Sequence, residues 1–121
     1  MALPINRSSD EVAVCFSLAD VAATTPAYTV APVKGYVSRI YTVVEGTTNG
    51  APVLTFNING TNITGGTITI ASGGGAGDVD SVEITHSATS FVQEGQYIKV
   101  TSDGAGSTTV NANIVLVLEQ A

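Results

Sequence analysis

Charged residues are scarce in this sequence. Asp, Glu, Lys and Arg make up 12% of its 121 residues, about half the share of an ordinary soluble domain. The net charge of −6 comes from ten acidic and four basic residues. Nucleic-acid backbones and anionic membranes are bound through clusters of Lys and Arg, so we expect neither as a partner. A surface covered mainly by Thr, Ser, Asn and Gly instead favours packing against other protein.

The residues that carry most enzyme chemistry are also scarce. Cys15 is the single cysteine and His86 the single histidine. Cys15 cannot form an internal disulfide, and its place in an alternating apolar run predicts a small buried hydrophobe. His86 has no second histidine for a metal cluster and no nucleophile elbow near it, which indicates a surface histidine. We therefore expect no catalytic residue, no bound metal and no cofactor.

Two short segments invite a ligand-binding interpretation that their neighbours weaken. The glycines at 73–75 and 77 lack the Lys-Ser/Thr that a phosphate loop needs, and Asp78 follows them, so a connecting loop is expected. Asp78, Asp80 and Glu83 could begin a calcium site, but three carboxylates supply too few ligands. We interpret them as solvated charge.

Targeting signals are missing as well. Residues 1–10 contain no apolar core of a signal peptide, and no run approaches the ~20 apolar residues of a membrane span. We expect the chain to be made in a cytoplasm and kept there or assembled there into something larger.

What the sequence does contain is repeated alternation of apolar and polar residues at period 2, bounded by Gly, Asn, Pro and Ser. This pattern predicts an all-β jelly roll or β-sandwich of about eight antiparallel strands. Residues 1–10 would form a short N-terminal arm and residues 11–121 a single domain. The segments expected to be extended are 11–18, 28–31, 35–45, 53–59, 62–70, 82–85, 91–92, 97–101 and 108–119.

Five residues are predicted to form a subunit interface. Tyr36, Arg39 and Tyr41 lie in the long apolar segment 35–45, and Tyr and Arg are enriched among interface anchors. Strict alternation puts Tyr36 on the opposite face from Arg39 and Tyr41, and the alternative is that both tyrosines cap the core. Val115 and Val117 face outward on the last strand, where apolar side chains need cover from another strand or subunit. Together these residues favour a homo-oligomer.

Three segments also carry a family resemblance. They are PVKGYVSRIYTVVEG from residue 32, LTFNINGTNITGGTITI from 54, and VQEGQYIKVTSDGAGSTTVNANIVLVLE from 92. The pattern consists of Pro-x-Lys-Gly, Asn-Gly-x-x-Ile-Thr-Gly-Gly and Glu-Gly-x-x-Ile-x-Val, followed by a Thr-rich final strand. Over roughly residues 11–119 it resembles the small capsid decoration (cement or head-fibre) proteins of tailed bacteriophages.

This resemblance implies a jelly roll that assembles as a homotrimer on the outside of a capsid, binds the major capsid protein and stabilises the shell. It implies a location on the virion, no catalytic residues and no cofactor. Pro4, Ile5 and Arg7 in the N-terminal arm would then be candidates for capsid contact.

Two other functions remain open. A module that binds host-surface glycans, as in a virion fibre, predicts exposed aromatics or an acidic metal site in the loops, for instance at Asp78 and Asp80. The absence of Trp and the total of seven aromatics count against it. A small hydrolase would need His86 to meet carboxylates that its spacing does not suggest.

Overall fold

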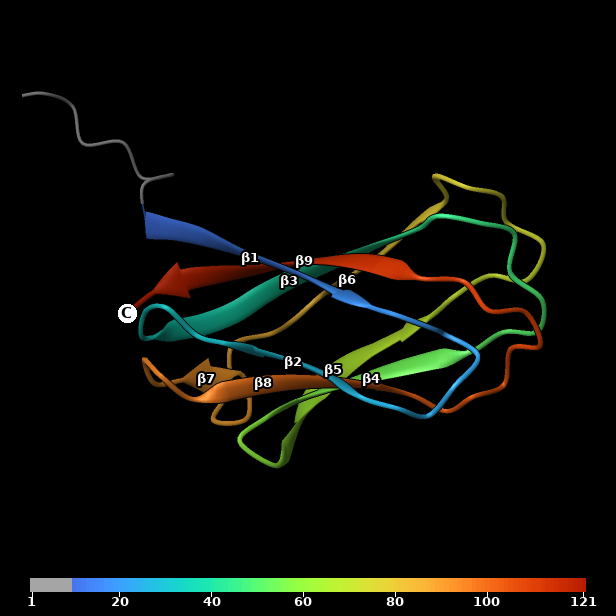
Figure 1. Cartoon of the computed structure of the whole chain (residues 1–121). Helices are drawn as coiled ribbons and strands as arrows, with labels where there is room; N and C mark the ends of the chain where they lie inside the picture. The colour runs from blue at the N-terminus through green and yellow to red at the C-terminus, as the bar shows by residue number, and fades with distance from the viewer. Residues whose placement is uncertain (1–9) are drawn as a thin grey trace, which may run out of the picture.

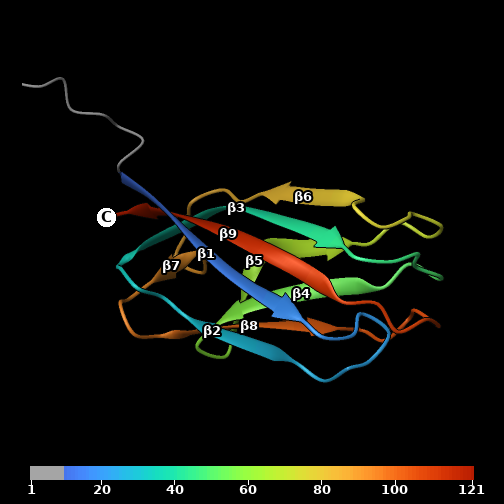
Figure 2. The ribbon, with the colours of Figure 1, turned by 45° about the horizontal axis from the view of Figure 1, so that its top comes forward.

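The computed structural model describes residues 10–121, and these form two antiparallel sheets packed face to face as a β-sandwich (Figures 1 and 2). The prediction of an all-β sandwich is confirmed, with nine strands. One sheet contains β1 (Glu11–Leu18), β9 (Ala112–Gln120), β3 (Gly35–Val44) and β6 (Val79–Glu83) in that order, and β7 (Phe91–Val92) also pairs with β3. The other contains β2 (Ala27–Val30), β8 (Tyr97–Ser102), β4 (Val53–Ile58) and β5 (Thr61–Thr69). None of the described segments is a helix that could span a bilayer.

Side-chain alternation decides which residues fill the space between the sheets. Phe56 of β4 and Ile98 of β8 meet Ile40 of β3 and Leu116 of β9, and all four are fully buried. Each such side chain contributes about 1.5–3 kcal/mol when it leaves water. The remaining faces of both sheets point outward.

Cys15 corrects one expectation. It lies on β1 between the inward Val14 and the half-buried Phe16, and its thiol is exposed. Because neighbouring residues of a strand point to opposite faces, Val14 occupies the core and Cys15 must face out. The expected small buried hydrophobe is therefore wrong.

A β-bulge changes the assignment of faces in β3. The register with β9 shifts between Val37 and Arg39, so that Val37 pairs with Leu118 and Arg39 with Val117. Ser38 occupies the extra position, and its hydroxyl donates a hydrogen bond to the Val117 carbonyl at 3.3 Å. An extra residue in one strand shifts the alternation of side chains. The residues before Ser38 therefore point to the face opposite the one that strict alternation predicts.

Two strands begin three or more residues away from the expected position. β6 begins at Val79, three residues earlier than expected, because residues 79–83 pair with β3. β9 begins only at Ala112, yet Val110 is buried and its carbonyl accepts a hydrogen bond from the Val21 amide at 2.9 Å. Val110 is apolar and buried although it lies in a loop. The alternating pattern therefore placed the start of this strand too early. Pro4, Ile5 and Arg7, the candidates for capsid contact, lie outside the described residues, as does most of the expected arm.

Candidate functional site

The outer face of the five-stranded sheet brings together all five residues predicted for a subunit interface. Arg39 lies opposite Val117 and Tyr41 opposite Val115 across the β3–β9 pair, with their side chains pointing away from the core. The bulge turns Tyr36 to this same face, so its expected place opposite Arg39 and Tyr41 is wrong. We call this surface the apolar face.

A polar contact on the apolar face fixes the guanidinium of Arg39. Arg39 Nη1 donates a hydrogen bond to Tyr41 Oη at 3.2 Å. This bond raises the pKa of Arg39 above its ordinary value, so the guanidinium stays charged. Glu83 lies directly opposite Arg39 on β6. Glu11 and Glu119 lie on the same face, so carboxylates outnumber the one guanidinium there, while Val115 and Val117 supply the apolar area.

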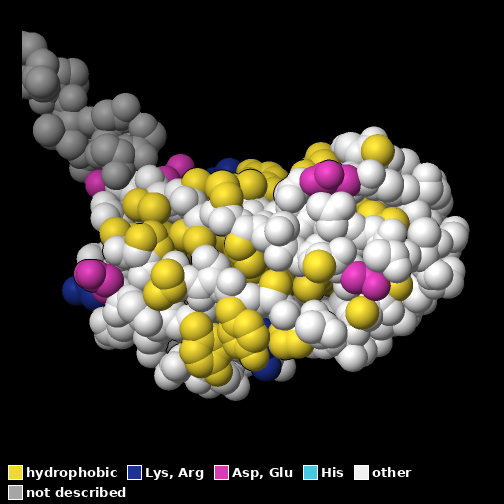
Figure 3. All heavy atoms as spheres, viewed as in Figure 1, with side chains coloured by type: hydrophobic (Ala, Val, Ile, Leu, Met, Phe, Trp, Pro, Cys, Tyr) yellow, Lys and Arg dark blue, Asp and Glu magenta, His cyan; other side chains and the backbone are white. Residues whose placement is uncertain are grey.

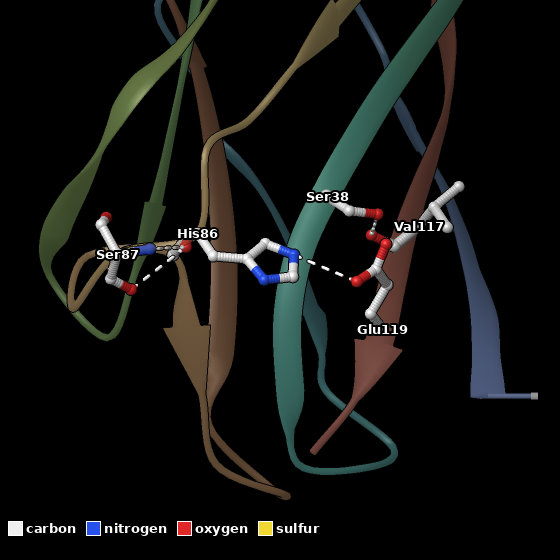
Figure 4. A network of polar contacts seen from close by, with 6 residues as sticks. Ser38, His86, Ser87, Val117 and Glu119 are labelled. Atoms are coloured by element: carbon white, nitrogen blue, oxygen red, sulfur yellow. Dashed lines mark hydrogen bonds and ion pairs between the residues drawn. The ribbon is translucent and has the colours of Figure 1, made fainter.

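His86 belongs to an aromatic cluster at the end of the apolar face. Its ring stacks on Tyr36 with centroids 4.6 Å apart, and Tyr36 meets Phe91 edge-on at 5.1 Å. Figure 4 shows the His86 ring pointing from the segment after β6 toward Glu119 on β9, and its Nε2 lies 3.2 Å from Glu119 Oε1. The neighbouring Ser87 bonds to Thr89 instead of His86. His86 is exposed at the surface, as the sequence predicts.

Asp78, Asp80 and Glu83 do not come together as metal ligands. Across the part of the chain that the structure describes, no group of three or more His, Cys, Asp or Glu side chains converges. Burial, and then the nearby Asp78, raise the pKa of Asp80, whose Oδ2 has no hydrogen-bond partner within residues 10–121. Burial and the nearby Asp78 thus destabilise the ionised form of Asp80.

The opposite outer face, on the four-stranded sheet, carries exposed aromatic rings. Tyr28 of β2 is 58% exposed and Tyr97 of β8 is 37% exposed, with ring centroids 5.6 Å apart in an edge-on arrangement. Val30, also exposed, pairs with Tyr97. Figure 3 shows hydrophobic side chains gathered on the lower, β8 side of this view, with a Lys or Arg beside them.

A groove adjoins these rings on the same face. Its volume is about 280 Å³, and it runs over β8, β4 and β5. Its walls are mostly hydroxyl and amide groups. The lining residues are Thr55, Asn57, Asn62, Lys99, Thr101, Ser102 and Asp103. We call this the polar groove.

Lys99 links the polar groove to the aromatic pair. The strand register places it between Tyr28 on β2 and Asn57 on β4, and Tyr97 precedes it by two residues on the same face. Side chains opposite one another in antiparallel strands lie within about 5.5 Å at their Cβ atoms. The rings, the cation and the amide thus form one continuous surface.

This surface is not among the sites predicted from the sequence, although part of its signal is present there. Within the expected segment 97–101, alternation points Tyr97 and Lys99 to the face opposite the apolar Ile98 and Val100. What the sequence did not contain was the pairing of β2 with β8 and of β8 with β4. That pairing joins Tyr28 and Asn57 to Lys99.

No protein-family model and no curated protein matches this sequence. Solved structures do resemble it. The catalytic domain of a GH87 α-1,3-glucanase in complex with nigerose matches 95% of this chain and 27% of its own, at 9% identity and a TM-score of 0.51. The catalytic unit of a thermostable GH87 α-1,3-glucanase from Streptomyces thermodiastaticus strain HF3-3 matches 92% of this chain and 26% of its own, at 14% identity and a TM-score of 0.50.

A third solved structure also matches this chain. CsCBM6-3 from Clostridium stercorarium, solved in complex with cellobiose, matches over 80% of this chain and 67% of its own, at 14% identity and a TM-score of 0.49. This chain spans about a quarter of the length of the two glucanase structures. At such identities the likeness concerns the β-sandwich fold.

Proposed function

We propose that this protein is a glycan-binding module that uses the outer face of its four-stranded sheet. The exposed Tyr28–Tyr97 pair beside a groove of hydroxyl and amide side chains carries this proposal. Aromatic rings pack against the apolar faces of sugars, while Asn and Thr side chains exchange hydrogen bonds with sugar hydroxyls. Exposed aromatics are the feature that the glycan-binding hypothesis predicts and that a purely structural role does not require.

Titration with oligosaccharides tests the proposal directly. Nigerose and a panel of neutral and acidic oligosaccharides are titrated into the full chain and followed by two-dimensional NMR. We expect shifts confined to β8, β4 and the Tyr28 strand. Tyr97→Ala should weaken binding about tenfold, since aromatic anchors commonly carry more than ~1 kcal/mol of binding free energy, and Tyr97→Phe should retain most of it.

Tyr41→Ala, on the apolar face, is the matched control and should leave sugar affinity unchanged. Circular dichroism confirms that each variant is folded. If no oligosaccharide shifts any resonance of β8 or β4 in the folded protein, glycan binding at this face is wrong.

A second candidate function rests on the apolar face. We propose that Val115, Val117 and Tyr41 pack against further copies of the chain, in a homotrimer that decorates the outside of a phage capsid and contacts its major capsid protein. The outward β-branched side chains of Val115 and Val117 support this, because subunit contacts of this kind depend on buried apolar area and shape.

Sedimentation tests the trimer. At micromolar concentration we expect a trimer, and the double variant Val115→Thr/Val117→Thr should dissociate it, since each change replaces a methyl by a hydroxyl at nearly constant volume. Val30→Thr, on the other outer face, is the control. A clean monomer for the unmodified protein overturns this candidate, and cosedimentation with capsids tests the partner.

A further inference from the structure

Charge is distributed very unequally between the two sheets. The strands β2, β4, β5 and β8 contain a single charged residue, Lys99. The strands of the other sheet contain five, namely Glu11, Arg39, Asp80, Glu83 and Glu119. The chain has a net charge of −6. Lys99 nevertheless lies in a sheet whose strands contain no carboxylate.

Lys99 also has no polar partner in the part of the chain that the structure describes. Within residues 10–121 it makes no hydrogen bond or ion pair, although it lines the polar groove. The one carboxylate of the groove, Asp103, lies beyond the end of β8. Asp103 Oδ1 accepts hydrogen bonds from the amides of Val53 at 3.1 Å and Ala105 at 3.0 Å. Backbone amides, not Lys99, balance its charge.

Asn57 adds an independent sign of a ligand. Its side chain is only 8% exposed and lines the groove beside Lys99. Its Oδ1 has no hydrogen-bond partner among the described residues. A buried acceptor left unpaired costs about 1–3 kcal/mol, so a ligand hydroxyl would recover this free energy once the side chains that cover Oδ1 move aside.

We propose that the polar groove selects a glycan whose terminal or internal sugar carries a carboxylate. The carboxylate binds the ammonium of Lys99 in a charge-assisted hydrogen bond, a hydroxyl of the same sugar donates to Asn57, and Tyr28 packs against the ring. This proposal rests on the glycan-binding function above and names its substrate class. Uronic and sialic acids share this chemistry.

Two matched ligand pairs test the proposal on the full chain by isothermal titration calorimetry. Trigalacturonate is compared with galactotriose, and sialyllactose with lactose. We expect the acidic member of at least one pair to bind about tenfold more tightly in about 0.01 M salt, and the preference to shrink in about 0.15 M salt as screening shortens the range of the charge. Lys99→Gln should abolish the preference and keep the weaker binding of the neutral sugar, and Lys99→Arg should retain it.

Lys34→Gln, an exposed lysine outside the groove, is the matched control and should leave the preference intact. A preference confined to one pair supports the proposal and identifies the sugar acid. Equal affinity for both members of each pair overturns acid selection while glycan binding stands. A preference that survives Lys99→Gln overturns the role of Lys99, and absence of binding to all four sugars by the folded protein overturns both proposals.

Discussion

Ser102, at the end of β8, joins two parts of the chain that are far apart in sequence. Its side chain is buried, and its hydroxyl donates a hydrogen bond to the Val21 carbonyl at 2.5 Å. The same oxygen accepts a hydrogen bond from the Gly104 amide at 3.1 Å. One hydroxyl thus connects the loop after β1 to the loop after β8, at the edge of the polar groove.

The cost of Ser102→Ala follows from what each partner loses. Val21 is buried, so its carbonyl would be left without a donor at about 1–3 kcal/mol. Gly104 is partly exposed, so its amide can turn to water and adds less than ~1 kcal/mol. We expect Ser102→Ala to lower the free energy of unfolding by about 2–3 kcal/mol and the melting temperature by about 8–12 °C.

Urea unfolding followed by circular dichroism measures this change, with a two-state fit checked by a second probe such as tyrosine fluorescence. Ser72→Ala, in the exposed loop between β5 and β6, removes the same hydroxyl from a solvated position and should change stability by less than ~0.5 kcal/mol. A loss below ~0.5 kcal/mol for Ser102→Ala would refute the reasoning, because it would mean that water replaces the buried hydroxyl.

Three further outcomes can be measured on the same material. Backbone amides hold the pKa of Asp103 below its ordinary value, so its ionised form stabilises the fold above that ordinary value, and this stabilisation is lost as the pH falls through the lowered pKa. Asp103→Asn should therefore flatten the acid limb of stability against pH. Burial, with Asp78 nearby, raises the pKa of Asp80, so its ionised form destabilises the fold; Asp80→Asn should raise the urea midpoint at neutral pH, and this advantage should disappear as the pH falls through the raised pKa. The exposed Cys15 thiol should react with Ellman's reagent at once in the folded protein, whereas a buried thiol would need denaturant.

Local alternation was sufficient to predict most of the sandwich. In β1, Val14 and Leu18 face the core while Ala13 and Ser17 face out, as period 2 requires. The same rule placed Leu54, Phe56 and Ile58 of β4 inward, and all three are buried. Such patterns can be recognised in the sequence because one face of the strand contacts solvent and the other packs in the core, so that polar and apolar residues alternate.

The bulge in β3 was beyond that reasoning. Its extra residue, Ser38, is held by the carbonyl of Val117, 79 positions later in the chain. Nothing in the run around Ser38 marks it, since a bulge is defined by the partner strand. Tyr36 was consequently assigned to the wrong face, although it belongs with Arg39 and Tyr41.

The polar groove was hidden for a related reason. Tyr28, Asn57 and Lys99 come from three strands, and they become neighbours through the register of β8 with β2 and β4. Sequence alternation predicts the direction of each side chain but not which strands pair. A surface built across strands needs that second piece of information.

A sandwich has two outer faces, and in this chain they differ in chemistry. One is apolar and carries Arg39 opposite Glu83, and the other is polar and aromatic, with Lys99 as the single charged residue of its strands. Because the core separates them, assembly through the first and glycan binding through the second do not compete for surface. Replacing Val117 should therefore disturb association without changing sugar affinity, and replacing Lys99 should do the reverse. Scarcity of charge makes this separation possible, since each face is defined by very few ionised groups.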